Sequence, residues 1–364
     1  MSENISRKRF LKRAGSALAL STIGFPSVIL SNNQEKLGVA LVGLGNYSTT
    51  RLAPGLQKTD HCELRGIVTG SPSKIPTWQE KYGIPDSNVY SYETMHELAN
   101  NDDIDVVYVV VPTGLHARYS IIAAEAGKHV WCEKPMAMNV KECQAIIDAT
   151  NKNGVQLAIG YRMQHEPNTR TIIRYGKEET YGAVTGVKTG AGYDGSHPEG
   201  NWRRDAELGG GALYDMGVYP INAARYSTSM EPIAASGIQS SERKEMYDEV
   251  DETTVFQLEF PGGVIADGET SFGKSMNYLD VDCTDGWYYL RPFQSYSGVK
   301  GKTSDGKILP PDPHHQQARQ MDSEALAIKE GRKPIVPGSE GLKDIRIVQA
   351  IMESSRKDGA KIQL

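Results

Sequence analysis

Short apolar runs alternate with polar, helix-compatible stretches through the first half of the chain. The run at 36–43 ends in glycine, and the β-branched run at 106–111 is apolar throughout. Continuous apolar runs of this length are typical of strands that a parallel sheet buries on both faces. Further strands are predicted at 62–68, 129–132 and 155–160, with helices up to 56 and at 76–82, 116–126 and 140–151. This alternation predicts an α/β domain built on a doubly wound parallel sheet.

The pattern changes beyond residue 161. A helix is predicted at 167–175, and strands are predicted where apolar and polar positions alternate, at 184–192, 252–260 and 263–271. The segments 236–251 and 291–317 are rich in Gly, Ser, Pro and charge and are predicted as loops. The second half therefore predicts an α+β domain with an open, mostly antiparallel sheet and helices on one face. We place the two domains at 35–160 and 161–364 and expect the last helices to pack back on the first domain.

Length and charge narrow the class of protein. A chain of 364 residues is long enough to form two domains, each with its own hydrophobic core. Its 39% hydrophobic and 23% charged residues are the composition of a globular protein. The net charge of -5 gives no general attraction to nucleic acid or anionic lipid. The four cysteines are scattered at Cys62, Cys132, Cys143 and Cys283 without metal-ligand spacing. No metal site and no disulfide scaffold are predicted from them.

The first 31 residues have the layout of an export signal. Basic residues at 7–13 precede a mildly apolar run at 14–30, and polar residues follow. The run is too short and too weakly apolar for a membrane span, so no stable membrane anchoring is expected. The basic cluster resembles a twin-arginine signal, with Lys8 where a second arginine is usual. A periplasmic protein is predicted; an uncleaved amphipathic segment is the alternative.

A glycine turn after the first strand is the first candidate site. Gly43 and Gly45 lie directly after an apolar strand and before a helix. Gly43 permits the tight turn, and Gly45 lets the backbone approach a pyrophosphate that rests on the helix N-terminus. Ser48 replaces the usual third glycine or alanine and is small enough for close helix packing. This context predicts a Rossmann dinucleotide site; a glycine turn without a ligand is the alternative.

The end of the second strand bears on the choice of nucleotide. NAD enzymes place a carboxylate there for the ribose 2′-hydroxyl, but residues 68–74 contain no acid. The hydroxyls of Thr69 and Ser71 and the ammonium of Lys74 suit a 2′-phosphate better. NADP is therefore favoured, with NAD as the alternative because Ser, Thr and Gly also form ordinary turns.

A lysine and a tyrosine are the candidate catalytic residues. Lys134 follows the strand at 129–132, so it lies at the carboxyl edge of the sheet, where α/β folds bind ligands. A lysine there can stabilise an alkoxide, although alone it would more often be a solvated surface residue. Asp215 and Tyr219 are four residues apart on a predicted helix and share one face. Tyrosine beside a cation can act as a general acid or base, because the cation lowers the phenol pKa.

These motifs together resemble the Gfo/Idh/MocA oxidoreductase family over essentially the whole chain after the signal. Within it they look closest to the periplasmic glucose–fructose oxidoreductases, which carry tyrosine where most members have histidine. Those enzymes have a long proline-rich arm after the signal that helps retain the cofactor, whereas this chain has only a short polar stretch there. The motifs that carry the resemblance are Gly43-x-Gly45, Glu133-Lys134-Pro135, Gly160-Tyr161-Arg162, Trp202-Arg203-Arg204, Gly209-Gly210-Gly211 and Asp215-Met216-Gly217-Val218-Tyr219.

The resemblance implies roles for individual residues. Lys134 and Asp215 would line the substrate site, and Tyr219 would exchange the proton. His116 matches a motif on the nucleotide side, although a packing role for it is an equal alternative. A homodimer or homotetramer is also implied. The cofactor residues would be Gly43, Gly45, Asn46, Tyr47, Thr69, Gly70, Ser71, Lys74, Pro112, His116, Glu133, Lys134 and Arg162, and the pocket residues Tyr161, Arg162, Trp202, Arg203 and either Tyr288 or Tyr289.

Three functions follow as hypotheses. The first is an NADP-dependent oxidoreductase of a sugar or sugar-like polyol, with hydride exchange between an aldose and a ketose as one form of it. The second is an NAD-dependent glycosidase that oxidises its sugar transiently. The third is a sensor that binds the dinucleotide without catalysis, against which the combination of Lys134, Asp215 and Tyr219 argues.

Overall fold

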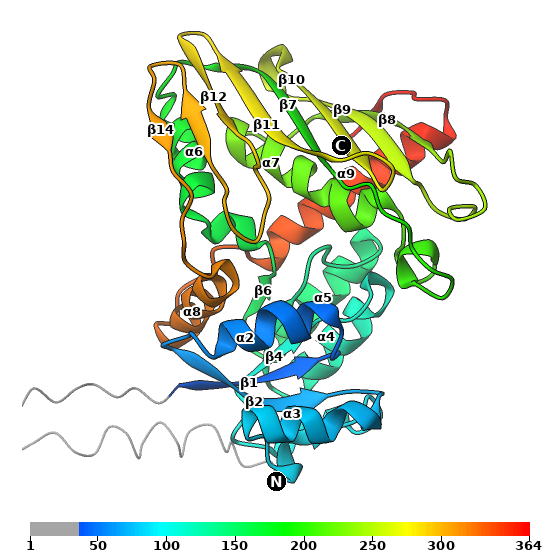
Figure 1. Ribbon diagram of the computed structural model, residues 1–364, viewed down its shortest axis with the longest axis vertical. Coiled ribbons are helices and arrows are strands. Elements are labelled where there is room, and N and C mark those ends of the chain that lie inside the picture. Colours follow the sequence, from blue (N-terminus) through cyan, green and yellow to red (C-terminus); the bar gives the residue numbers. More distant parts are fainter. Residues whose placement is uncertain (1–35) are drawn as a thin grey trace, which may run out of the picture. The chain divides into compact units, whose positions relative to one another are not determined.

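A parallel sheet forms the first part of the fold. The computed structural model describes residues 36–364, so the predicted signal lies outside the described residues and stays a prediction. Six strands pair in the order β3-β2-β1-β4-β5-β6, all parallel (Figure 1). They are β1 (Leu37–Val42), β2 (Cys62–Val68), β3 (Val89–Tyr90), β4 (Val106–Val109), β5 (His129–Cys132) and β6 (Leu157–Ile159). The predicted doubly wound Rossmann sheet is confirmed.

The order of the strands reverses between β1 and β4, and this creates the ligand-binding crevice of such folds. Gly43 makes the turn after β1 with a φ of 93°. A side chain there would also meet the Val110 carbonyl oxygen at 2.6 Å, so only glycine fits. The helix after the turn opens with a π-helical turn at Ser48–Leu52 and continues as α2 (Ala53–Leu56); the other helices of this part are α3 (Ile75–Tyr82), α4 (His116–Glu125) and α5 (Val140–Lys152).

A second sheet of nine strands forms most of the C-terminal part, in the order β14-β13-β12-β11-β7-β10-β9-β8-β15. All neighbours are antiparallel except β7 and β10, so the predicted mostly antiparallel sheet is confirmed with one parallel pair. The strands are β7 (Val184–Gly192), β8 (Ala234–Ser240), β9 (Thr253–Glu259), β10 (Ile265–Ser271), β11 (Met276–Cys283), β12 (Gly286–Leu290), β13 (Gly301–Thr303), β14 (Ile308–Leu309) and β15 (Ile362–Gln363).

The segments 236–251 and 291–317 both contain regular structure, so the prediction that they are loops is wrong in part. Strand β8 occupies the start of 236–251, while β13, β14 and the first residues of a helix lie within 291–317. The sequence of β8, Ala-Ala-Ser-Gly-Ile-Gln-Ser, lacks the alternation of large apolar and polar residues that signals a strand. Strands β13 and β14 have only three and two residues, too few for any period to be visible.

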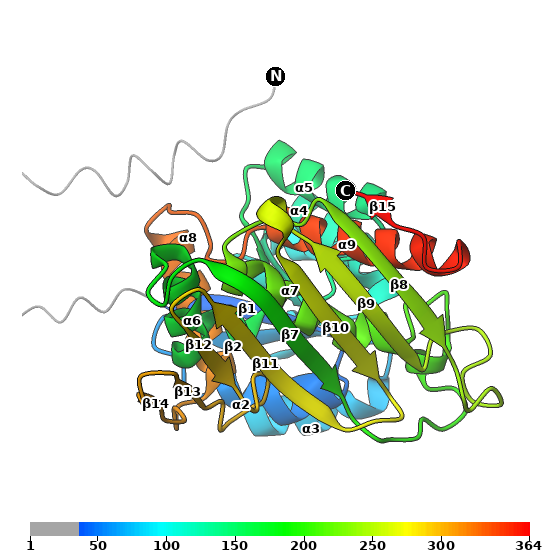
Figure 2. The same cartoon turned by 90° about the horizontal axis from the view of Figure 1, so that it is seen from above.

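Helices α6 (Pro167–Glu178), α7 (Val218–Thr228) and α9 (Gly338–Arg356) cover one face of the second sheet (Figures 1 and 2). The opposite face exposes Ile238 and Val255. Helix α8 (Gln316–Lys329) packs instead on the first sheet, where Met321 and Ala325 join the hydrophobic cluster of β1 and β2. No helix within residues 36–364 combines the length and apolar character that a membrane crossing requires.

Candidate active site

Lys134, Asp215 and Tyr219 meet at the carboxyl edge of the parallel sheet. Lys134 follows β5, and its Nζ donates a hydrogen bond to the Asp215 carbonyl oxygen at 2.7 Å and lies 3.6 Å from the Asp215 carboxylate. The same ammonium lies 4.8 Å from the centre of the Tyr219 ring. Asp215 sits in a π-helical turn (Leu213–Gly217) that runs directly into α7, where Tyr219 is the second residue. The structure thus brings together the three residues predicted to be catalytic.

The charges of these residues hold the site together. Burial alone would raise the pKa of the Asp215 carboxyl, but Arg203 and Lys134 outweigh it and lower that pKa below its ordinary value. Burial likewise lowers the pKa of Lys134, and the neighbouring Tyr219 and Asp215 more than reverse this effect. At neutral pH the pair is therefore an ammonium and a carboxylate. A cation fixed beside a phenol is suited to stabilise negative charge that develops on a reacting oxygen.

Arg203 binds the second oxygen of the Asp215 carboxylate. Its Nε donates to Asp215 Oδ2 at 2.7 Å, and its guanidinium lies 4.5 Å from the Trp202 ring centre. The glycine loop at 209–211 binds this segment through its main chain, because Gly211 N donates to the Arg203 carbonyl at 3.0 Å. Gly211 has a φ of 97°, and a side chain there would meet Asp251 at 2.2 Å. The glycine loop therefore places Arg203 against Asp215.

Arg162 is a buried cation next to the candidate acid–base residue Tyr219. Its guanidinium lies 5.5 Å from the Tyr219 ring centre and 4.6 Å from that of Tyr296. The guanidinium also donates to Gln316 Oε1 at 2.6 Å and to the Ser295 carbonyl at 2.7 Å. These contacts fix the orientation of a buried cation beside the candidate acid–base residue.

Tyr296 closes the side of the site that faces the glycine turn. Arg51 lies 4.1 Å from its ring centre, on the helix that follows the turn, and Tyr47 lies 6.0 Å away, ring to ring. Burial raises the pKa of Tyr296, and the neighbouring Tyr219 adds to this effect. Tyr296 therefore stays a neutral phenol between the two halves of the site.

Glu133 is buried beneath the site and held by a chain of hydrogen bonds. Tyr108 donates to its carboxylate at 2.6 Å, and Gln320 Nε2 of α8 donates to the Tyr108 hydroxyl at 2.8 Å. Gly160 is required beside it, because a side chain there would meet the Glu133 carboxylate at 2.6 Å. Burial raises the pKa of Glu133, with the Tyr108 hydrogen bond opposing it.

The predicted dinucleotide residues gather around the ends of β1 and β2. Lys74 Nζ donates to the Leu44 carbonyl at 2.8 Å, and the Thr69 hydroxyl accepts from Ser71 N at 3.0 Å. No atom lies within 4 Å of the position that a Gly45 side chain would take, so the turn is open where a pyrophosphate would approach. The residues fit a nicotinamide dinucleotide. Asn46 follows β1, Gly70 follows β2 and Pro112 follows the neighbouring strand β4.

Three residues that were predicted to line the cofactor site or the substrate pocket make most of their contacts with other parts of the protein. His116 is buried, and both ring nitrogens lie 2.8 Å from main-chain carbonyls, those of Pro135 and Val111; burial lowers its pKa to about 4. Tyr161 is buried beside the Asp344 carboxylate. The structure does not bring Tyr288 to the site, because its hydroxyl donates to the Ser227 carbonyl near the far end of α7 at 3.2 Å. Tyr296, not Tyr288, is the additional tyrosine against Tyr219.

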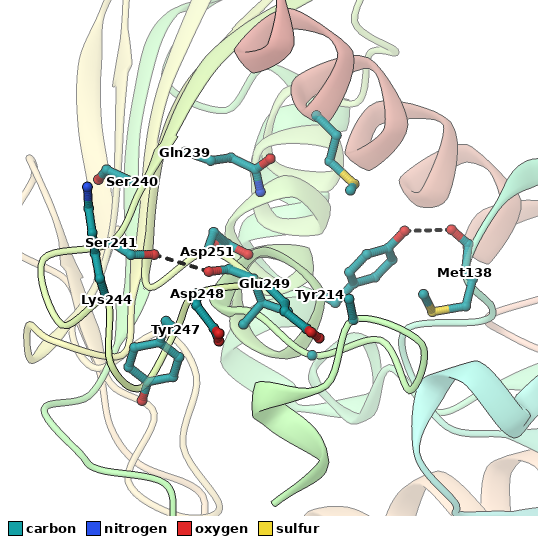
Figure 3. Close-up of a pocket in the computed structure, with 14 residues that line it drawn as sticks. Met138, Tyr214, Gln239, Ser240, Ser241, Lys244, Tyr247, Asp248, Glu249 and Asp251 are labelled. Carbon is teal, nitrogen blue, oxygen red and sulfur yellow. Dashed lines mark hydrogen bonds between the residues drawn. The ribbon is translucent and has the colours of Figure 1, made fainter. Parts of the chain in front are cut away.

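A separate pocket of about 550 Å³ lies behind the glycine loop (Figure 3). Asp251 lines it, and its carboxylate accepts from Leu213 N at 2.9 Å and from the Thr254 hydroxyl at 2.7 Å. Tyr214, across the pocket, donates to the Met138 carbonyl (Figure 3). None of Lys134, Asp215 and Tyr219 lines this pocket. Its lining residue Asp251 therefore holds the start of the helical segment that carries Asp215, and the reaction site lies elsewhere.

Asp251 gives a testable dependence of stability on pH. Burial raises its pKa from 3.8 to about 6 in the folded protein. Between these values the folded state holds a proton that the unfolded state has released, so stability falls as pH rises from about 4 to about 6. Asp251→Asn keeps an acceptor for Leu213 N and cannot ionise. We expect the variant to gain about 3 kcal/mol relative to the wild type between pH 4 and pH 7, measured by denaturant unfolding; a pH-independent difference would contradict this assignment.

Fold and site together define a nicotinamide-dependent oxidoreductase. Residues 37–161 match the oxidoreductase family with an NAD-binding Rossmann fold, and residues 169–289 match the GFO/IDH/MocA C-terminal domain. The chain belongs to the Gfo/Idh/MocA oxidoreductase family, as its motifs predicted.

Three relatives each cover most of the chain. A crystal structure of aldose-aldose oxidoreductase from Caulobacter crescentus, complexed with glycerol, is 38% identical with a TM-score of 0.87 and covers 91% of this chain and 100% of that one. The D-xylose 1-dehydrogenase [NADP(+)] of Haloarcula marismortui is 29% identical over 330 residues, which are 88% of this chain and 91% of the relative. A 3-ketoreductase from Actinomadura kijaniata, in complex with NADP and TDP-benzene, shares the fold at 23% identity, with a TM-score of 0.77 and coverage of 88% and 98%.

Proposed function

We propose that the protein is an NADP-dependent oxidoreductase that oxidises a hydroxyl of an aldose or a similar polyol. The observation that carries this proposal is the arrangement of Lys134 over the Tyr219 ring with its ammonium on Asp215, at the carboxyl edge of the dinucleotide-binding sheet. The relatives named as an aldose-aldose oxidoreductase and a D-xylose dehydrogenase support the sugar class. A bound nicotinamide supplies the hydride acceptor.

The residues of this chain carry the remaining chemistry. Tyr219 takes the proton of the substrate hydroxyl, and Lys134 stabilises the negative charge on the substrate oxygen. Asp215, ionised and held by Arg203, keeps the Lys134 ammonium in place. Glu133, Arg162, Thr69 and Lys74 would hold the dinucleotide, with Lys74 and Thr69 on the ribose 2′-phosphate.

Lys74 tests the preference for NADP. It is exposed in the structure, and a charge-assisted hydrogen bond to a phosphate adds more affinity than a neutral one. We expect Lys74→Ala to raise the Kd of NADP at least about tenfold and to leave the Kd of NAD within about twofold, both measured by fluorescence titration. Lys81→Ala, which removes another exposed lysine nearby, is the control. An equal loss for both nucleotides would mean that Lys74 acts only on the turn, through its bond to Leu44.

The activity is tested by following the near-ultraviolet absorbance of reduced nicotinamide in the purified protein. Glucose, xylose and other aldoses are added with NADP or NAD, and a rise in absorbance supports the proposal. Reversal of that rise by a second sugar, such as fructose, would identify hydride exchange between sugars on a retained cofactor. Release of an aglycone from a glycoside without net nucleotide change would favour a glycosidase. Binding of NADP with no reaction of any kind would favour a sensor.

A further inference from the structure

A buried histidine lies beside the Arg203–Asp215 pair and takes no part in the chemistry described above. His197 follows β7, and its Nε2 lies 2.8 Å from the Tyr193 hydroxyl while its Nδ1 lies 2.8 Å from the Tyr247 hydroxyl. The Phe272 ring packs against the imidazole edge to face, with 4.7 Å between ring centres. The imidazole therefore connects two phenols beside an aromatic ring, with both of its nitrogens engaged.

Tyr193 is the hydrogen-bonded partner of His197 that lies near Arg203 and Asp215. Its hydroxyl interacts with the Arg203 guanidinium, and the Asp215 carboxylate is near enough to affect its ionisation. Burial, with the charge of Asp215, raises the pKa of Tyr193, so it is a neutral phenol at physiological pH. Its ring is only half-buried, whereas Tyr247 is fully buried. Among the three hydrogen-bonded residues Tyr193, His197 and Tyr247, Tyr193 is thus the one that a substrate can reach.

Arg243 holds the main chain around His197 in place through several hydrogen bonds. Arg243 donates to the Gly195 carbonyl at 3.0 Å and to the Phe272 carbonyl at 2.6 Å, and its Nε pairs with Glu252 at 2.5 Å. Tyr247 lines the pocket behind the glycine loop, and Figure 3 shows its hydroxyl turned away from the other labelled side chains. A hydroxyl held by a second layer of this kind is positioned with little freedom.

We propose that Tyr193 binds a hydroxyl or carbonyl oxygen of the sugar, and that His197 is the positioning residue that holds Tyr193 for this task. The inference rests on the proposed sugar oxidoreductase function and deepens it.

The chemistry of a neutral imidazole suits this role. Burial lowers the pKa of His197, and Arg203 adds to the effect, so the ring carries a single N–H at neutral pH. With the proton on Nδ1, the ring accepts from the Tyr193 hydroxyl and leaves the phenol oxygen to accept from a sugar hydroxyl. With the proton on Nε2, the ring donates to Tyr193 and leaves its O–H to donate to a carbonyl. The same side chain can therefore bind both the alcohol and its oxidised product.

Three single variants separate positioning from packing. Tyr193→Phe removes only the hydroxyl. The amide of His197→Gln reaches the place of Nε2 and can still bind Tyr193, whereas the amide of His197→Asn reaches only the place of Nδ1 and loses that bond. We expect Tyr193→Phe and His197→Asn to raise the KM of the sugar about tenfold with kcat within about threefold, because the bond contributes to binding in ground and transition states alike. His197→Gln should stay within about threefold of the wild type, and the Kd of NADP should not change.

The double variant Tyr193→Phe/His197→Asn should be no worse than Tyr193→Phe alone, because both changes remove one interaction. An unchanged KM for Tyr193→Phe, equal effects of the two His197 variants, or additive losses in the double variant would each overturn the proposal. Should the His197 variants not fold, Tyr247→Phe replaces them and is expected to raise KM only when Tyr193 is present. If the wild type binds NADP but oxidises no sugar, the proposed function fails and this inference with it. If the wild type is active and Tyr193→Phe matches it, only this inference fails.

Discussion

Tyr219→Phe is expected to lower kcat by about a hundredfold to ten-thousandfold while leaving NADP affinity unchanged, because general acid–base catalysis contributes this much. The Tyr219 ring lies 4.8 Å from the Lys134 ammonium and 5.5 Å from the Arg162 guanidinium. Removing its oxygen leaves the substrate proton without an acceptor but changes neither the volume nor the packing of the ring. The measurement is the steady-state rate of nicotinamide reduction at saturating sugar, alongside a fluorescence titration with NADP.

Tyr214→Phe is the matched control for this variant. Tyr214 lies one helical turn earlier, is buried to a similar degree and donates its hydroxyl to the Met138 carbonyl, away from the site. Its kcat should stay within about threefold of the wild type even if stability falls by about 1 kcal/mol. A Tyr219→Phe enzyme that keeps more than a tenth of the wild-type kcat would rule out Tyr219 as the proton acceptor and direct attention to Tyr296.

Arg225→Met is expected to reduce the free energy of unfolding by about 3–5 kcal/mol, the usual cost of leaving a buried charge without its partner. Arg225 joins α7 to α9: its guanidinium binds Asp344 at 2.6 Å, Glu340 at 2.8 Å and Glu231 at 2.7 Å. Asp344 is fully buried, and burial raises its pKa despite the opposing charge of Arg225. Denaturant unfolding monitored by circular dichroism measures the change.

Lys343→Met provides the comparison on the same cluster. Lys343 binds the same Glu231 and Glu340, at 2.9 and 3.0 Å, but its side chain is 41% exposed. Exposed ion pairs contribute about 1 kcal/mol or less, so this variant should lose little stability. Equal losses from Arg225→Met and Lys343→Met would show that the buried carboxylate of Asp344 is not the source of the effect.

The parallel sheet could be predicted because its central strands, β1 and β4, are apolar throughout. The structure gives β2 and β5 the same bounds as the pattern does, and β7 likewise. Helix α8 shows why other elements could not be delimited from the pattern. Its buried face mixes Gln316, Gln320 and Glu324 with Met321 and several alanines, so polar residues at inward positions weaken the amphipathic signal. Their partners, such as Arg162 and Tyr108, are known only once the chain has folded.

The candidate site divides in the same way. Lys134, Asp215 and Tyr219 could be found because each stands at a predictable place, after a strand or on a helix face. Tyr296 and Tyr193 lie outside the strands and helices, where no periodicity marks a residue. A tyrosine in a segment rich in Ser, Gly and Pro has no feature that distinguishes it from other exposed tyrosines. Contacts with Arg51 and Arg162 define Tyr296, and the hydrogen bond with His197 defines Tyr193.

Helix α8 also determines how far the first sheet can fold during synthesis of the chain. Met321 and Ala325 complete the hydrophobic cluster of β1 and β2, and Gln320 completes the hydrogen bonds that hold Glu133. These residues leave the ribosome after all six strands of the first sheet and after strands β7 to β14 of the second sheet. The nucleotide-binding half therefore cannot reach its final packing before α8 has been synthesised, so a dinucleotide meets a completed site only after most of the second sheet has been made.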